Sequence, residues 1–236
     1  MTGTRTDNPP RRVTDLLEHK RHGATVTCQT AFEILPVDFQ HRANPFRAHI
    51  FLCLFYGDID GTAYAFRKCY ARGCPNNLCP HVSQAVLIAN RYLQRDYRKL
   101  KAAGIEVEAS LFTLADMLVQ FEQVSEGGQP AWTLPDLVAA AGEGRAIQVA
   151  VALSFMEAVE HFDRQEQGQT YLMGDFSATV DGVACRSERC FACFPTAGGE
   201  DERRRAVTIA DARLDLLYAE FDQVGIACER PFFRNI

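Results

Sequence analysis

The sequence predicts an α+β fold built from two similar halves, each a β-hairpin followed by a cysteine loop and a helix. Three observations predict this arrangement. Strand-forming segments flank a Gly-Asp turn in each half, a cluster of cysteines follows each pair of strands, and an amphipathic helical pattern follows each cluster. We expect residues 1–22 to form a flexible N-terminal arm, residues 23–125 the first half and residues 131–236 the second half.

The first half contains the clearer hairpin signal. Residues 24–35 alternate loosely and favour a strand, and residues 49–55 are apolar and rich in aromatic side chains. The turn signal Gly57-Asp58-Ile59-Asp60-Gly61 separates the latter from residues 62–66. Residues 80–103 then repeat apolar side chains at helical spacing, and we predict a helix there.

The second half repeats this order of signals. We expect a short helix at residues 110–124, at the end of the first half, and another at residues 135–141, at the start of the second; the loop between them marks the boundary. The apolar run at residues 147–161 fits either a strand or a helix. A second strand pair surrounds Gly174-Asp175, and a polar loop leads to a helix at residues 209–224. The parallel order indicates an internal duplication, with coincidence as the alternative.

The first cysteine cluster consists of Cys69, Cys74 and Cys79, each separated from the next by four residues. A loop with this spacing lets several thiolates converge on one metal ion, and its backbone amides can hydrogen-bond to sulfur. The fourth ligand would be His81, Cys53 or Cys28. Cys53 lies in an apolar segment, where a core cysteine is the alternative interpretation.

The second cluster consists of Cys185, Cys190 and Cys193. In ligand spacing it resembles the plant-type 2Fe–2S ferredoxins, whose cysteines follow a Cys-x4-Cys-x2-Cys pattern with one distant ligand. The resemblance covers these positions only, and Cys228, near the C-terminus, is the candidate for the distant fourth ligand. A thioredoxin-like redox pair formed by Cys190 and Cys193 is the competing interpretation.

Composition limits the classes of partner and location. The formal net charge is −5, which argues against a dedicated nucleic-acid-binding protein. No apolar run is long enough to cross a bilayer, and the polar N-terminus has no signal-peptide pattern, so we expect a cytoplasmic protein with no membrane partner. Nine cysteines in a reducing compartment favour metal binding over disulfides.

These observations predict an iron–sulfur protein that transfers electrons or senses redox state, with a protein redox partner. The cluster type, 2Fe–2S or 4Fe–4S, stays open. Two alternatives remain: a structural zinc protein that acts as an adaptor, and an iron–sulfur enzyme with an open coordination site. The sequence contains no nucleotide-binding loop, nucleophile elbow or zinc-protease motif, so it identifies no catalytic residue.

Overall fold

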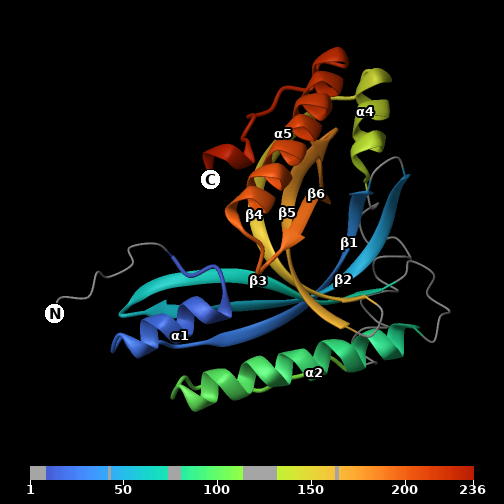
Figure 1. Ribbon diagram of the computed structural model, residues 1–236. Coiled ribbons are helices and arrows are strands. Elements are labelled where there is room, and N and C mark those ends of the chain that lie inside the picture. The colour runs from blue at the N-terminus through green and yellow to red at the C-terminus, as the bar shows by residue number, and fades with distance from the viewer. Residues whose placement is uncertain (1–8, 42–43, 74–80, 114–131, 163–164) are drawn as a thin grey trace.

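The chain is a mixed α/β protein whose six strands form a closed barrel (Figure 1). The computed structural model describes residues 9–41, 44–73, 81–113, 132–162 and 165–236. The elements follow one another as α1 (Val13–Arg21), β1 (Gln29–His41), β2 (Asn44–Ile59), β3 (Thr62–Gly73), α2 (His81–Ala102), α4 (Leu134–Gly142), β4 (Ile147–Phe162), β5 (Gln165–Val180), β6 (Val183–Pro195), α5 (Glu200–Gln223) and the 3₁₀ turn η1 (Phe233–Asn235).

The barrel consists of two antiparallel three-stranded sheets joined along two parallel seams. Strands β1, β2 and β3 form one sheet, and β4, β5 and β6 form the other. One seam pairs Cys69 of β3 with Ala158 of β4, and the other pairs Phe39 of β1 with Cys190 of β6. Both seams are short, so the long strands diverge on either side of a central crossing (Figure 1).

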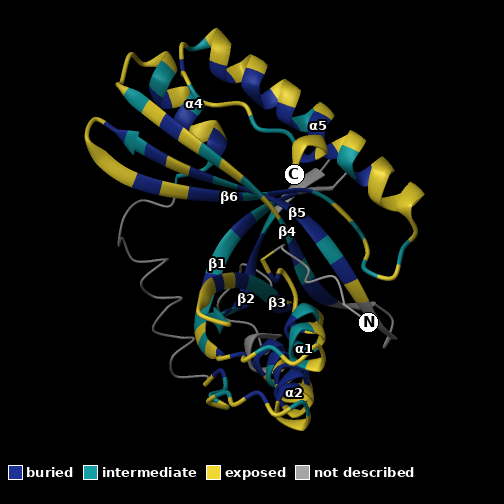
Figure 2. Ribbon diagram, turned by 90° about the vertical axis from the view of Figure 1, so that its left-hand side faces the viewer, coloured by how far each residue is buried: buried dark blue, intermediate teal, exposed yellow. Residues whose placement is uncertain are grey.

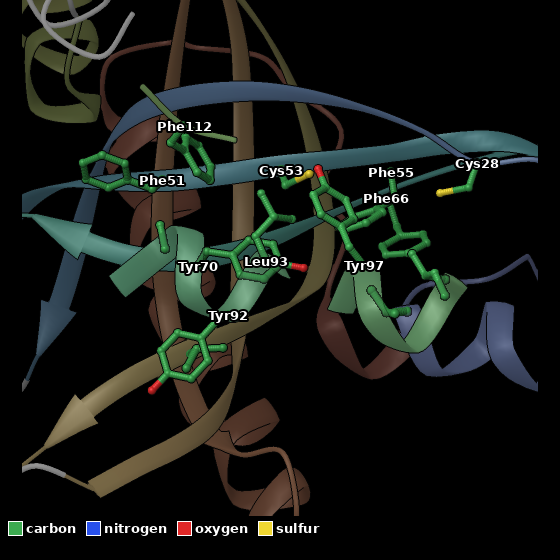
Figure 3. Close-up of a cluster of buried hydrophobic side chains, with 14 of the residues drawn as sticks. Cys28, Phe51, Cys53, Phe55, Phe66, Tyr70, Tyr92, Leu93, Tyr97 and Phe112 are labelled. Carbon is green, nitrogen blue, oxygen red and sulfur yellow. The ribbon is translucent and has the colours of Figure 1, made fainter. Parts of the chain in front are cut away.

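Helix α2 covers the outer face of the first sheet. Its apolar side chains Ala89, Leu93 and Leu100 are fully buried and lie at helical spacing on one face. They pack against a sheet face that includes Phe51 and Phe55, and Figure 3 shows this cluster of aromatic side chains between the helix and the strands. Burial of this apolar stripe is what fixes α2 on the sheet.

Helix α5 covers the second sheet in the same way. Figure 2 shows that it buries one face and exposes the other. The buried side chains come three or four residues apart and pack against Phe176 and Phe191. They are Ala206, Ala210, Leu214, Leu217 and Phe221.

A third cluster fills the barrel itself and draws side chains from all six strands. These side chains alternate along each strand with those that face the helices, as a pleated strand requires. The cluster contains Val37, Phe39, Ala48, Ile50, Leu52, Cys69, Met156, Ala158, Tyr171, Met173 and Cys190. The barrel is therefore packed at its centre.

Both sheets carry the same irregularity. The register shifts between Phe51 and Leu52 where β2 pairs with β3, and between Leu172 and Met173 where β5 pairs with β6. The extra residue lies on the last strand of each sheet and re-aims the backbone that follows it.

Several predicted boundaries are corrected by the structure. The flexible arm does not extend over Val13–Arg21, which form α1 with Val13 and Leu16 buried. Residues 110–113 are not helical, and the rest of the helix predicted there lies outside the described residues. The final helix begins at Glu200, within the predicted polar loop, because Gly199 supplies an N-cap and three acidic side chains occupy its first turn.

The hairpins are also longer than predicted, because each sheet has three strands. The ambiguous run at residues 147–161 is strand β4, and the predicted helices at residues 80–103 and 135–141 correspond to α2 and α4. In the part of the chain that the structure describes, no helix is long and apolar enough to span a membrane.

Candidate functional site

The second cysteine cluster lies in a strand, which corrects the prediction of a loop. Cys185, Cys190 and Cys193 all belong to β6. Cys185 packs in the helix-covered cluster, Cys190 packs inside the barrel and Cys193 is exposed. Five extended residues span roughly 16 Å, so Cys185 and Cys190 are far apart and on opposite faces. Cys228, the proposed distant ligand, packs on the same cluster as Cys185.

The first cysteine cluster is described only in part. Cys69 lies in β3 and points into the barrel, whereas Cys74 and Cys79 lie outside the described residues, as does the side chain of His81. The alternative fourth ligands Cys28 and Cys53 are buried on the other face of the sheet, under α2 (Figure 3). The structure therefore does not bring Cys53 to the face that Cys69 occupies.

The buried cysteines also lack the environment of reactive thiols. Burial raises the pKa of the Cys53 thiol far above its ordinary value, and it raises the pKa of Cys28, Cys185 and Cys228 in the same direction. Within the described ranges, no three side chains among His, Cys, Asp and Glu are grouped closely enough to hold a metal ion. A metal site at the first cluster remains a prediction, because Cys74 and Cys79 lie outside those ranges.

A cavity of about 560 Å³ opens at one end of the barrel. Every strand contributes to it, because the two sheets diverge there around the packed centre. One lining residue from each strand, in chain order, is Glu33, Leu54, Arg67, Met156, Asp175 and Arg186. We call this cavity the barrel mouth. Its volume is in the range typical of small-molecule sites, which occur often in the mouths of β-barrels.

The floor of the barrel mouth is an ion-pair network that crosses the barrel. Arg67 of β3 donates from Nη1 to Oε1 of Glu188 on β6 at 2.7 Å. Arg186 Nη2 lies 2.7 Å from the same oxygen and 2.5 Å from Asp175 Oδ2, and its Nε donates to Asp175 Oδ1 at 3.0 Å. Glu33 extends the network from β1, with its Oε1 at 3.7 Å from Arg186 Nη1. The network therefore joins both sheets below the cavity.

Glu188 is the most buried member of this network, with 3% of its side chain exposed. Its Oε2 atom is buried and has no hydrogen-bond partner among the described residues. Burial raises the pKa of Glu188, an effect that the charges of Arg67 and Arg186 oppose only in part. A buried carboxylate oxygen without a partner is costly, and it is the kind of feature that concentrates at functional sites.

The barrel mouth combines these charges with an apolar wall. Leu54 comes from β2, Ala65 from β3 and Met156 from β4. Among the described residues, Arg67 donates one hydrogen bond, from Nη1 of its guanidinium to Glu188. A guanidinium has five N–H donors, so Arg67 keeps donors for another group. The site can therefore hold a molecule with one anionic end and an apolar body.

A second, larger cavity of about 710 Å³ lies beside the barrel mouth. It lies between α1 and the start of α5 and shares Arg11, Phe155 and Ile236 with the smaller cavity. Some of its polar groups already pair: Asp15 binds Arg12, and Glu202 accepts from the N-cap amide at Gly199. We favour the smaller cavity because two of its lining residues, Arg67 and Arg186, bind a buried carboxylate, Glu188, that is only partly paired.

Another buried charged cluster stabilises the fold at the seam between β3 and β4. Lys68 Nζ lies 2.8 Å from Asp96 Oδ2 and 3.4 Å from Glu157 Oε2, and Tyr70 donates to Asp96 at 2.7 Å. Asp96 belongs to α2, so this cluster attaches the helix to the barrel. Each charge has an opposite charge nearby, which is the usual condition for burial.

The chain matches no protein-family model, no curated protein and no solved structure. Its functional assignment therefore depends on the geometry described above. Sequence reasoning did not identify the barrel mouth: Asp175 was interpreted as a turn former, and Arg186 and Glu188 as part of a cysteine loop. The available signal was a strand pattern in which Arg186, Glu188 and Cys190 occupy alternate positions and so share one face.

Proposed function

We propose that this protein binds a small organic anion in the barrel mouth. The observation that carries the proposal is the partly paired network at its floor, where Arg67 retains donors and Glu188 retains a buried oxygen without a partner. An anionic ligand group would meet Arg67, and an apolar ligand body would lie along Leu54, Ala65 and Met156. The protein would act as a receptor or carrier, or as an enzyme on such a molecule.

A comparison of the two sheets supports this proposal. Arg67 and Glu188 are 121 residues apart. The two register shifts are separated by the same number of residues. So are the turn residues Asp60 and Asp181, which both have positive φ, and the seam residues Cys69 and Cys190. We infer that the two halves arose by duplication, each now a three-stranded sheet followed by a helix. If each half is such a unit, circular permutation at the loop between the halves should preserve the barrel.

Under this correspondence, charges at the barrel mouth are not required by the fold. Leu54 occupies the position that corresponds to Asp175, and Ala65 the one that corresponds to Arg186. An apolar or small side chain thus fills the same place in the first sheet without loss of the barrel. The charged residues of the second sheet are better explained by a ligand than by packing.

The proposal is tested by ligand-observed NMR with benzoate and cyclohexanecarboxylate, each paired with its uncharged amide. We expect the carboxylates to bind and the amides to bind at least tenfold more weakly, which corresponds to the loss of about 1.4 kcal/mol of charge-assisted hydrogen bonding. Arg67→Leu should abolish the preference for the carboxylate.

Arg47→Leu is the matched control. Arg47 is also a strand arginine paired with a carboxylate, Asp38, at 3.0 Å, but it does not line the barrel mouth. It should leave binding unchanged. Equal binding of acids and amides, or equal loss in both variants, would refute an anion site at Arg67.

Metal binding by the first cysteine cluster is the second candidate, favoured by the spacing of Cys69, Cys74 and Cys79. As an iron–sulfur site it would serve electron transfer or redox sensing with a protein partner, and as a zinc site it would serve an adaptor. Iron, zinc and acid-labile sulfide would be measured on protein purified without oxygen, for the wild type and for Cys74→Ser. Metal that is absent from both proteins would eliminate this candidate.

A further inference from the structure

The charges around the barrel mouth constrain the ligand more narrowly than the proposed function does. Two carboxylates, from Glu33 and Asp175, and two guanidiniums, from Arg67 and Arg186, line it. A third carboxylate, Glu188, is buried against the two guanidiniums and does not line the cavity itself. Arg11 adds a third positive charge at the rim. With all six side chains ionised, their charges sum to zero, so together they offer no net attraction for an anion.

Any anion bound at Arg67 must share that guanidinium with Glu188. The ligand's negative charge and the loss of part of the Arg67 interaction both disfavour the ionised form of Glu188. Burial already acts in that direction and raises the pKa of this carboxyl group. A proton added at Glu188 would offset the ligand's charge, and it would supply the unpartnered Oε2 with a hydrogen.

The other charged groups near Glu188 cannot offset the ligand's charge in place of this proton. Arg186 approaches Oε1 from the same strand, but Asp175 already holds its guanidinium at two atoms. Glu33 of β1 and Asp175 of β5 are negative and oppose a bound anion. From β2 and β4 the barrel mouth receives Leu54, Ser154 and Met156, which carry no charge.

We propose that the barrel mouth binds a monocarboxylate with a compact apolar body, and that each molecule bound brings one proton to Glu188. This inference rests on the proposed function. In charge terms, one carboxylate and one proton enter together, and the site stays neutral. A dianion such as a phosphate monoester would leave an uncompensated negative charge beside Glu33 and Asp175, so the site should discriminate against it.

The proton is measured by isothermal titration calorimetry with benzoate at one pH in two buffers of different ionisation enthalpy. The experiment is repeated from pH 6 to pH 8, where benzoate itself stays ionised. We expect uptake to approach one proton per benzoate, and the affinity to fall by up to about tenfold per pH unit once free Glu188 is ionised. Phenyl phosphate should bind at least tenfold more weakly than benzoate.

Glu188→Gln keeps the shape of the side chain and cannot take up the proton. It should bind benzoate with no proton uptake and no dependence on pH. Asp175→Asn is the matched control, since it removes a carboxylate from the same network and leaves Glu188 in place, so the uptake should persist.

The outcomes separate the two proposals, and the wild-type titration decides even if a variant fails to fold. Benzoate binding without proton uptake would overturn this inference and leave the anion site intact. Uptake that persists in Glu188→Gln would overturn the assignment of the proton to Glu188. If neither benzoate nor cyclohexanecarboxylate binds, both the anion site and its proton coupling are overturned.

Discussion

The ion pair between Arg67 and Glu188 connects strands that are 121 residues apart, so its strength can be predicted and measured directly. Arg67→Leu would leave Glu188 buried with Arg186 as its remaining positive partner. Breaking a buried pair costs about 3–5 kcal/mol. We expect less, about 2–3 kcal/mol at pH 8, because Arg186 stays in place and the Arg67 side chain is 20% exposed.

The reciprocal variants complete a double-mutant cycle. Glu188→Leu removes the costly buried carboxylate and leaves Arg67 accessible to water, so the expected cost is about 1 kcal/mol or less. The double variant replaces both partners with apolar groups and should be close to the wild type. The resulting coupling energy is about 2–4 kcal/mol, from urea unfolding followed by circular dichroism.

The coupling should also depend on pH with a definite sign. The pKa of Glu188 is higher in the folded protein than in the unfolded chain, where it is about 4.3. Between these two values the folded state binds more protons, so stability falls as pH rises through the folded value. Glu188→Leu should remove this decrease. At low pH, where Glu188 is protonated, Arg67→Leu should cost less than at pH 8.

The pair of Arg145 and Asp181 is the control for this cycle. Its two atoms are 2.6 Å apart, but the side chains are 39% and 48% exposed. An exposed pair contributes about 0–1 kcal/mol. If the Arg67–Glu188 cycle gives a coupling energy no larger than this control, the two residues do not form a buried pair across the barrel. The proposed site would then lack the ion pair on which it depends.

Three further variants test separate parts of the structure. Leu16→Ala should destabilise the protein by about 2–4 kcal/mol in urea unfolding, because Leu16 is fully buried. A cost near zero would instead support the predicted flexible N-terminal arm. Gly57→Ala should lower the free energy of unfolding by more than about 1 kcal/mol, because the added Cβ would clash with the Thr27 carbonyl. Gly142→Ala is the control, since a Cβ there meets open space. Thiol labelling with peptide mapping should modify exposed Cys193 within minutes and leave Cys53 protected until unfolding; equal rates would contradict the burial of Cys53.

The helices were the most predictable part of this fold. The pattern at residues 80–103 repeats apolar side chains on one face, and α2 covers nearly the same residues. The start of α5 was missed for a physical reason. Its first turns are rich in charge and lack an apolar stripe, so they resemble a loop, although acidic side chains near the N-terminus stabilise a helix.

The error at the second cysteine cluster arose from treating spacing as proximity. In a loop, residues five and three positions apart can converge on one metal ion. In an extended strand, odd separations place side chains on opposite faces, and Cys185 and Cys190 follow this rule. Strand-forming neighbours such as Val183 and Phe191 were the evidence for the extended conformation.

The barrel mouth could not be predicted because its residues meet only through the closure of the barrel. Arg67 and Glu188 lie in different sheets, and nothing local to either residue indicates the other. At the separation of 121 residues that relates Arg67 to Glu188, Leu54 stands against Asp175 and Ala65 against Arg186. Glu188 stays buried at a cost that apolar residues would avoid. A costly and asymmetric set of charges in an otherwise apolar barrel is what selection for a ligand would maintain, and this argument holds independently of any cysteine.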